Sequence, residues 1–154
     1  MDSYFLLKFI HILSATVLTG TGIGIAFFMW MVCRSNNAQA IKVVARLVIL
    51  ADWIFTAPAV VVQFISGVLL MQRLGYSYTS PWFITVLSLF IFIGLCWLPV
   101  VYIQYRLRSL AHNDNVESPA FFRLMRYWTL LGIPAFSSII VMFWLMIFKP
   151  FAVA

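Results

Sequence analysis

Polar residues inside long apolar stretches are the positions of this sequence that could do chemistry, because burying them in lipid is costly. The first such stretch holds His11. At 100° per residue, an arc of about 80° contains His11 and a column of small residues: Ala15, Thr19, Gly22 and Ala26. This face fits a close helix–helix contact in which the imidazole is hydrogen-bonded to a neighbour. It equally fits a groove for a flat cofactor, with His11 as the axial ligand of a haem iron.

Three further residues are expected near the depth of His11 in the membrane. His11 lies about 10 Å into the first apolar stretch, at 1.5 Å per residue. Gln63, Ser88 and Met142 lie at similar depths in the other three stretches. Gln63 or Ser88 could orient the imidazole, and the Met142 thioether could be a second ligand. One expectation is therefore a cofactor site built on His11, with Gln63 or Ser88 orienting the ring and Met142 as a second ligand. The other is a packing role in which His11 is hydrogen-bonded across the bundle.

The second apolar stretch carries a polar face that must point toward protein. An arc of about 80° holds five residues: Asp52, Thr56, Ala59, Gln63 and Ser66. Asp52 lies near the N-terminal end of this stretch, where the helix dipole favours an anion. Arg34 and Arg126 lie at similar depth, so an interfacial ion pair with Asp52 is expected. A proton-relay role for Asp52 is the alternative.

Four apolar stretches must position these residues, and each exceeds the roughly 20 residues that a helix needs to cross the hydrocarbon core. They span residues 4–32, 47–71, 81–105 and 124–148. The 154 residues are 64% hydrophobic and 9% charged, against roughly 45–50% and about 25% in soluble domains. This composition excludes a soluble enzyme, a disordered regulator and a nucleic-acid reader. It predicts an all-α integral membrane four-helix bundle, with residues 1–154 as a single transmembrane domain.

Local signals agree with these helices. Ser80 and Ser118 each precede a proline and predict N-caps, Asn36 or Asn37 could cap the second helix, and Gly75 could end it. Pro58, Pro99 and Pro134 lie inside spans two, three and four, where they predict kinks. Gly20 and Gly24 form a GxxxG pattern that could serve the bundle or a dimer. The N-terminal stretch is interpreted as the first span and not as a cleavable signal, since no basic segment precedes it.

The basic residues predict the orientation in the membrane. Seven flank the 1–2 and 3–4 connections: Arg34, Lys42, Arg46, Arg106, Arg108, Arg123 and Arg126. Three lie on the other side: Lys8, Arg73 and Lys149. Because cytoplasmic loops are enriched in Lys and Arg, we expect both termini to be periplasmic in a bacterial inner membrane.

Three segments carry a resemblance to known membrane proteins: KFIHILSATVLTGTGIG, ARLVILADWIFTAPAVVVQFISGVLLM and FFRLMRYWTLLGIPAFSSIIVMFWLMIFKPF. They resemble a family of small bacterial integral membrane proteins known as a domain of unknown function. More distantly, they resemble the HemJ-type protoporphyrinogen oxidases and the copper-resistance CopD domain. The HemJ-type resemblance implies haem b bound through a first-span histidine, which corresponds to His11, and an oxidoreductase activity. That family carries a basic residue in the third span, whereas residues 81–105 contain no Lys, His or Arg.

The sequence is therefore consistent with two alternative functions. The first is a membrane protein that binds haem b or a porphyrin through His11, with a redox role. The second is a non-catalytic accessory or assembly subunit that docks on a larger membrane complex or forms a homo-oligomer. A channel or transporter is disfavoured because the spans contain so few ionisable groups. In every case the lipid bilayer is the main partner, and nucleic acid is not one.

Overall fold

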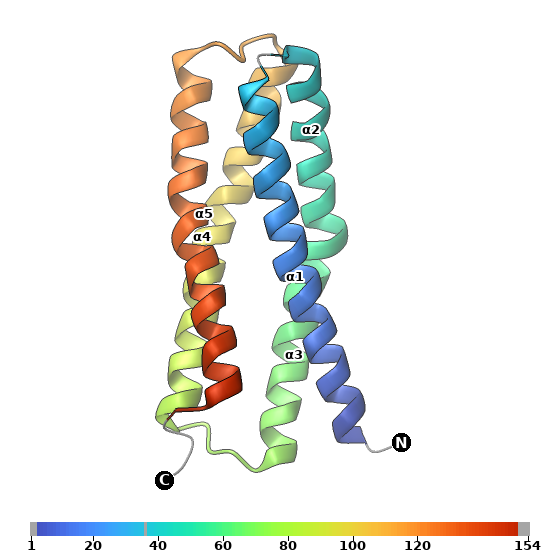
Figure 1. Ribbon diagram of the computed structural model, residues 1–154, viewed down its shortest axis with the longest axis vertical. Helices are drawn as coiled ribbons and strands as arrows, with labels where there is room; N and C mark the ends of the chain where they lie inside the picture. Colours follow the sequence, from blue (N-terminus) through green and yellow to red (C-terminus); the bar gives the residue numbers. More distant parts are fainter. Residues whose placement is uncertain (1–2, 36, 151–154) are drawn as a thin grey trace.

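Long helices make up nearly all of the computed structural model, which describes residues 3–35 and 37–150 (Figure 1). Their bounds are α1 Ser3–Arg34, α2 Ala38–Ala51, a short π-helical segment η1 Asp52–Thr56, α3 Ala57–Leu74, α4 Pro81–His112 and α5 Pro119–Phe148. Helix α2, η1 and α3 run on without a break over Ala38–Leu74, so four rods result, each long and apolar enough to cross a membrane. Each rod contains one of the four predicted stretches, and the described residues include no strand. The predicted all-α membrane bundle is confirmed.

The helix ends follow from local chemistry. Asn37, Ser80 and Ser118 each accept, through the side chain, the backbone N–H three residues further on, at 3.0, 3.3 and 3.2 Å. Each cap satisfies one of the N–H groups that a helix leaves unpaired at its start. Gly75 ends α3 with φ +67°, a left-handed conformation that favours glycine. The predicted caps are therefore present, with Asn37 as the cap of α2, while Asn36 lies outside the described residues.

The π-helical segment lies just before Pro58. The N–H of Ala57 donates to the carbonyl of Asp52, five residues back. Pro58 has no N–H, and its ring would crowd the carbonyl four residues earlier in a regular α-helix. A locally widened turn relieves this crowding without breaking the rod, which is how proline is accommodated in membrane helices. Sequence analysis predicted a kink here, and the structure has a π turn.

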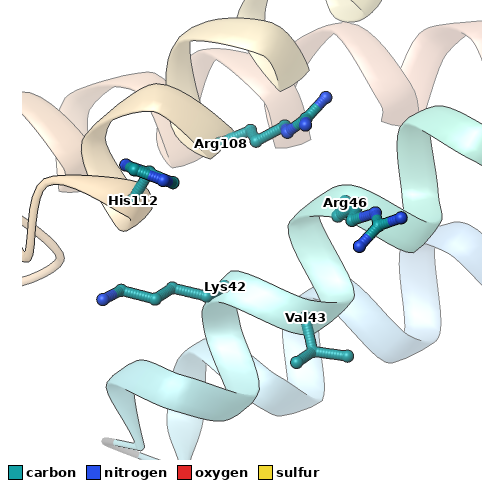
Figure 2. Close-up of a pocket in the computed structure, with 5 residues that line it drawn as sticks. All are labelled: Lys42, Val43, Arg46, Arg108 and His112. Carbon is teal, nitrogen blue, oxygen red and sulfur yellow. The ribbon is translucent and has the colours of Figure 1, made fainter.

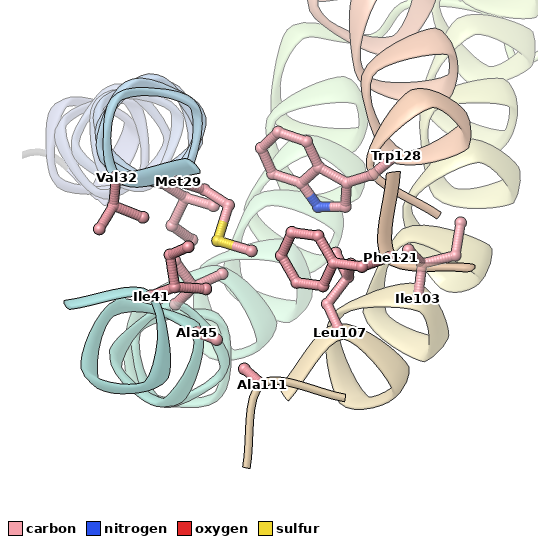
Figure 3. Close-up of a cluster of buried hydrophobic side chains, with 11 residues drawn as sticks. Met29, Val32, Ile41, Ala45, Ile103, Leu107, Ala111, Phe121 and Trp128 are labelled. Atoms are coloured by element: carbon pink, nitrogen blue, oxygen red, sulfur yellow. The ribbon is translucent and has the colours of Figure 1, made fainter. Parts of the chain in front are cut away.

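The helices pack as two pairs that are joined mainly at one end. Helix α1 packs on α3, α4 packs on α5, and α2 contacts both α1 and α4. We call the end with residues 34–38 and 112–119 the basic end, and the end with the two chain termini the terminal end (Figure 1). The main apolar core lies at the basic end (Figure 3). Its most deeply buried large side chains are Met29, Leu107 and Phe121.

The outside of the bundle is apolar along its length. Leu95, Leu98 and Ile147 expose 63%, 62% and 73% of their surface, and many other large apolar side chains are exposed. Contiguous exposed apolar surface on this scale is incompatible with water and matches lipid. The informative buried groups are therefore the polar ones.

Candidate cofactor site around His11

His11 lies between α1 and α3 with both ring nitrogens in hydrogen bonds. Its Nδ1 is 2.9 Å from Ser66 Oγ, and its Nε2 is 3.0 Å from the side-chain nitrogen of Gln63. Ser66 Oγ donates its own proton to the carbonyl of Val62 at 2.6 Å. Because a hydroxyl has one proton, Ser66 must accept from the imidazole. The proton of His11 is thus on Nδ1, and the lone pair is on Nε2.

The orientation of Gln63 is consistent with this tautomer. Ser14 Oγ is within hydrogen-bond reach of both Gln63 Oε1 and the carbonyl of His11, the latter at 3.0 Å, and its single proton is shared between them. With Oε1 toward Ser14, the amide nitrogen of Gln63 faces His11 Nε2 as a donor. The side chains form one directed chain of hydrogen bonds from Ser14 through Gln63 and His11 to Ser66. Ser14 and Ser66 are buried. In a low-dielectric interior such a fully satisfied network rigidifies its members.

A glycine allows the imidazole to approach α3 closely. A Cβ atom at position 67 would lie 3.2 Å from His11 Cε1, which is tighter than ordinary van der Waals contact. Gly67 therefore leaves the space that the ring occupies. By contrast, Cβ atoms at Gly20, Gly22 and Gly24 of α1 would meet nothing within 4 Å. The GxxxG pattern thus does not serve packing within the bundle.

The chemistry available to His11 is that of a neutral imidazole with an oriented Nε2. Imidazole ligands in metal sites have this arrangement, with the second ring nitrogen donating to an oxygen. The described residues contain no group of three or more His, Cys, Asp and Glu side chains that could hold a metal ion. In this structure the Gln63 amide occupies Nε2, so any ligand of Nε2 would have to displace it.

The predicted layer around His11 is only partly assembled. The expected contact with Gln63 is present. Ser88 is exposed and Met142 is half-buried, and neither has a hydrogen bond to His11 among the described residues. Ser14 was not predicted as part of the site, although it lies three residues from His11 and hence on the same side of α1. Ser66 was predicted on the polar face of its span, but not in contact with His11.

The column of small residues drifts from the interior to the surface of the bundle. Ala15 and Thr19 are half-buried, whereas Gly22 and Ala26 are exposed. Thr19 donates to the carbonyl of Ala15 at 2.8 Å, so its hydroxyl is satisfied within α1. The column therefore runs along α1 from the partly buried side to the exposed apolar surface.

Asp52 is buried, but the predicted ion pair with Arg34 or Arg126 is not present among the described residues. Its Oδ1 accepts from the indole Nε1 of Trp97 at 3.4 Å, and its Oδ2 has no partner within the part of the chain described. Arg34 and Arg126 are both exposed, and the Arg34 guanidinium stacks 3.9 Å from the Trp30 ring centroid. Asp52 thus faces the interior of the bundle, while the two arginines are exposed.

Thr56, one turn after Asp52, is also buried without a hydrogen-bond partner among the described residues. Elsewhere in the spans, hydroxyls such as those of Thr16, Thr85 and Thr129 donate to the carbonyl four residues back. The carbonyl four residues before Thr56, that of Asp52, accepts the backbone N–H of Ala57 in the π turn. Of the other members of the predicted polar face, Ala59 and Ser66 are buried and Gln63 is half-buried, so this face points toward protein.

Comparison with known proteins agrees with the architecture. A family model described as a predicted integral membrane protein, DUF2269, matches residues 5–150. No curated protein and no solved structure matches the chain. The match includes all four rods and the His11 network, and covers well over half of the sequence. The chain therefore belongs to the DUF2269 family of integral membrane proteins.

Proposed function

We propose that this protein binds haem b, or a related porphyrin, with His11 as the axial ligand. The observation that carries the proposal is the position of Ser66, whose hydroxyl lies 2.9 Å from His11 Nδ1 and donates to the carbonyl of Val62. This arrangement leaves the ring proton on Nδ1 and the lone pair on Nε2, where the Gln63 amide now donates. A neutral imidazole held in this way is a good haem ligand, and bound haem would supply one-electron redox chemistry.

Each residue around the ring then has a defined task. Ser66 accepts from Nδ1–H, which fixes the ring orientation and raises the basicity of Nε2. Gln63 must release Nε2, and its amide keeps the Ser14 hydroxyl as a partner. Gly67 provides the space for the ring against α3. Met142 of α5 is proposed as the second ligand, because thioether sulfur binds haem iron.

A visible spectrum of the purified protein tests this proposal. Protein from haem-replete cells should show a Soret band, and His11→Ala should abolish it. His112→Ala is the matched control, because His112 is exposed at the other end of the bundle. Met142→Ala should shift the spectrum if sulfur is bound. Wild-type protein without haem, or His11→Ala protein that retains it all, would disprove haem binding.

A second candidate function is that of an accessory subunit of a larger membrane complex. It is favoured by the open space around Gly20 and Gly24, since a small-xxx-small face promotes close helix association in membranes. Gly20→Leu should then prevent co-purification of a partner protein or formation of a homo-oligomer. The control is Gly132→Leu, at a glycine of α5 with equal space around it. Equal loss in both variants, or no loss in either, would reject a specific helix interface.

We further propose that the basic end faces the cytoplasm of a bacterial inner membrane, with both termini periplasmic. Seven of the ten Lys and Arg residues flank the two connections at that end, as the positive-inside rule requires. Cysteine labelling of intact cells with an impermeant reagent tests the orientation. Ser77→Cys should be labelled and Asn113→Cys should not. The reverse pattern would invert the assignment.

A further inference from the structure

An open groove at the basic end is lined by four basic side chains from two helices. Lys42 and Arg46 come from α2, and Arg108 and His112 come from α4 (Figure 2). Each pair is four residues apart, so its members lie on one helix face, one turn from each other. The groove has a volume of about 360 Å³, within the roughly 300–1,000 Å³ typical of small-ligand sites. Apart from these side chains, its lining is Val43.

Little negative charge offsets these groups. Asp114 bonds the Lys42 ammonium at 2.8 Å, and it is the only acidic residue in an ion pair within the described residues. Arg46, Arg108 and His112 are exposed. Guanidinium groups present paired N–H donors that match phosphate oxygens. The groove is therefore suited to a phosphate-bearing group.

The surface below the basic groups is aromatic and apolar. Trp53 of η1 donates through its indole nitrogen to the hydroxyl of Tyr105 of α4, at 2.9 Å. Trp53 is 57% exposed and Tyr105 is 44% exposed. Trp53 follows Arg46 by seven residues, so it lies about 10 Å deeper and on nearly the same helix face. The hydrogen-bonded pair bridges the same two rods directly beneath the groove.

We propose that this groove binds an anionic phospholipid, with its phosphate among Arg46, Arg108 and Lys42 and an acyl chain over the Trp53–Tyr105 pair. A phospholipid has a charged head for the basic groove and an apolar tail for the aromatic surface of Trp53 and Tyr105. Free phosphate would contact the basic groove alone. The membrane-surface position supports a lipid, since basic pockets between membrane helices bind anionic headgroups. Amphipathic aromatic rings also prefer this interface. The site lies far along the rods from His11 and does not depend on haem binding.

Native mass spectrometry of detergent-purified protein, titrated with phosphatidylglycerol, tests the proposal. Phosphatidylcholine is the charge control for the headgroup. Arg46→Gln and Arg108→Gln should each weaken phosphatidylglycerol binding about fivefold, which is the usual effect of one basic residue near an anionic lipid surface. Asp114→Asn should strengthen it, because Lys42 is then released from its ion pair. Trp53→Ala should weaken binding of both lipids.

Three outcomes would overturn the lipid site. Arg123→Gln is the matched control, since Arg123 is exposed at the same end but does not line the groove. If it weakens binding as much as Arg108→Gln, only diffuse surface charge is at work. If inorganic phosphate displaces the lipid completely and Trp53→Ala has no effect, the site recognises free phosphate. Equal binding of phosphatidylglycerol and phosphatidylcholine would show that the groove does not recognise the charge of the headgroup. Thermal unfolding of each variant checks that the fold is retained.

Discussion

The two ends of the bundle are held together by different interactions. At the basic end, apolar side chains from α1, α2, α4 and α5 meet in one buried cluster (Figure 3). At the terminal end, α1 is joined to α3 by the hydrogen-bonded network of His11. There the two helix pairs meet through individual contacts, such as the Phe64 ring stacked on the Phe90 ring with centroids 5.8 Å apart.

The difference follows from where α2 lies. Helix α2 contacts both α1 and α4, whereas the described part of α3 packs mainly on α1 and η1. The rod Ala38–Leu74 therefore links the two pairs in its first half and belongs to one pair in its second half. Apolar packing is concentrated at the basic end, and the hydrogen-bonded polar network lies at the terminal end. Functional regions are generally drawn from the less tightly packed parts of a fold.

Truncating a central side chain of the basic-end cluster should have the largest effect. Phe121 is 1% exposed, and its neighbour Phe122 is 60% exposed. Phe121→Ala should lower the free energy of unfolding by about 3–5 kcal/mol, because it removes packed surface and leaves a cavity. Phe122→Ala is the matched control and should cost much less. The edge-to-face contact between the two rings is lost in both variants, so it cancels.

Titration with SDS, followed by circular dichroism, measures this difference in detergent-purified protein. Equal destabilisation by the two substitutions would show that lipid contact and core contact are equivalent. The contrast between the two ends would then lose its basis.

A methyl group against His11 should perturb the terminal end without removing any polar atom. In Gly67→Ala, the new Cβ would lie 3.2 Å from His11 Cε1. Overpacking of this kind costs about 1–3 kcal/mol and should shift the imidazole away from Ser66. Gly132→Ala is the control, since its Cβ would meet nothing within 4 Å.

Nitrogen NMR of the His11 ring reads the geometry directly, alongside the SDS titration. We expect changed imidazole shifts in Gly67→Ala only. Unchanged shifts in Gly67→Ala, with the same stability as Gly132→Ala, would show that position 67 does not set the ring position.

The substitution Asp52→Asn should show whether the Asp52 carboxylate is an isolated buried group or one member of an ion pair. Asp52→Asn keeps an oxygen to accept from Trp97, and no basic group contacts Asp52 within the described residues. The free energy of unfolding of the Asp52→Asn variant should therefore lie within about 1 kcal/mol of the wild-type value, or above that value. Asp52→Ala is the comparison, because it leaves the Trp97 indole without an acceptor. A large loss in Asp52→Asn that Arg126→Gln relieves would instead indicate an ion pair.

The fold could be predicted because the length of an apolar stretch and its capping residues are local properties. The contact of His11 with Gln63 could also be predicted, since depth follows from residue counts along antiparallel helices. Depth does not specify which rods are adjacent. Ser88 and Met142 share the depth of His11 but belong to the other helix pair. The residues of the expected layer are therefore split between the two pairs.

Asp52 shows a second limit of sequence reasoning. Two arginines at its depth suggested an ion pair, but Asp52 is buried whereas Arg34 and Arg126 are exposed. The partner that the structure provides is the indole nitrogen of Trp97. A tryptophan in an apolar stretch counts as hydrophobic in any periodicity argument, although its N–H is a donor.

The smallest expected effect on the free energy of unfolding comes from removing the cation–π contact of Lys149 or of Arg34, which lie at opposite ends of the bundle. Lys149 donates to the Tyr76 hydroxyl at 3.2 Å and lies 5.1 Å from the centre of its ring, so it joins the end of α5 to the loop after α3. Arg34 stacks on Trp30 within the same helix. An exposed cation–π contact contributes about 0.5–1 kcal/mol.

Lys149→Gln should therefore lower the free energy of unfolding by up to about 1 kcal/mol, because it removes a contact between separate elements at the sparsely connected end. Arg34→Gln removes a contact that α1 retains locally even when the helices separate, so its effect on SDS unfolding should be smaller still. Tyr76→Phe tests which part of the Lys149 contact matters, since it removes the hydroxyl and keeps the ring. If Arg34→Gln proves the more harmful substitution, the terminal end does not depend on its few bridging contacts, and the contrast between the two ends must rest on the apolar cluster alone.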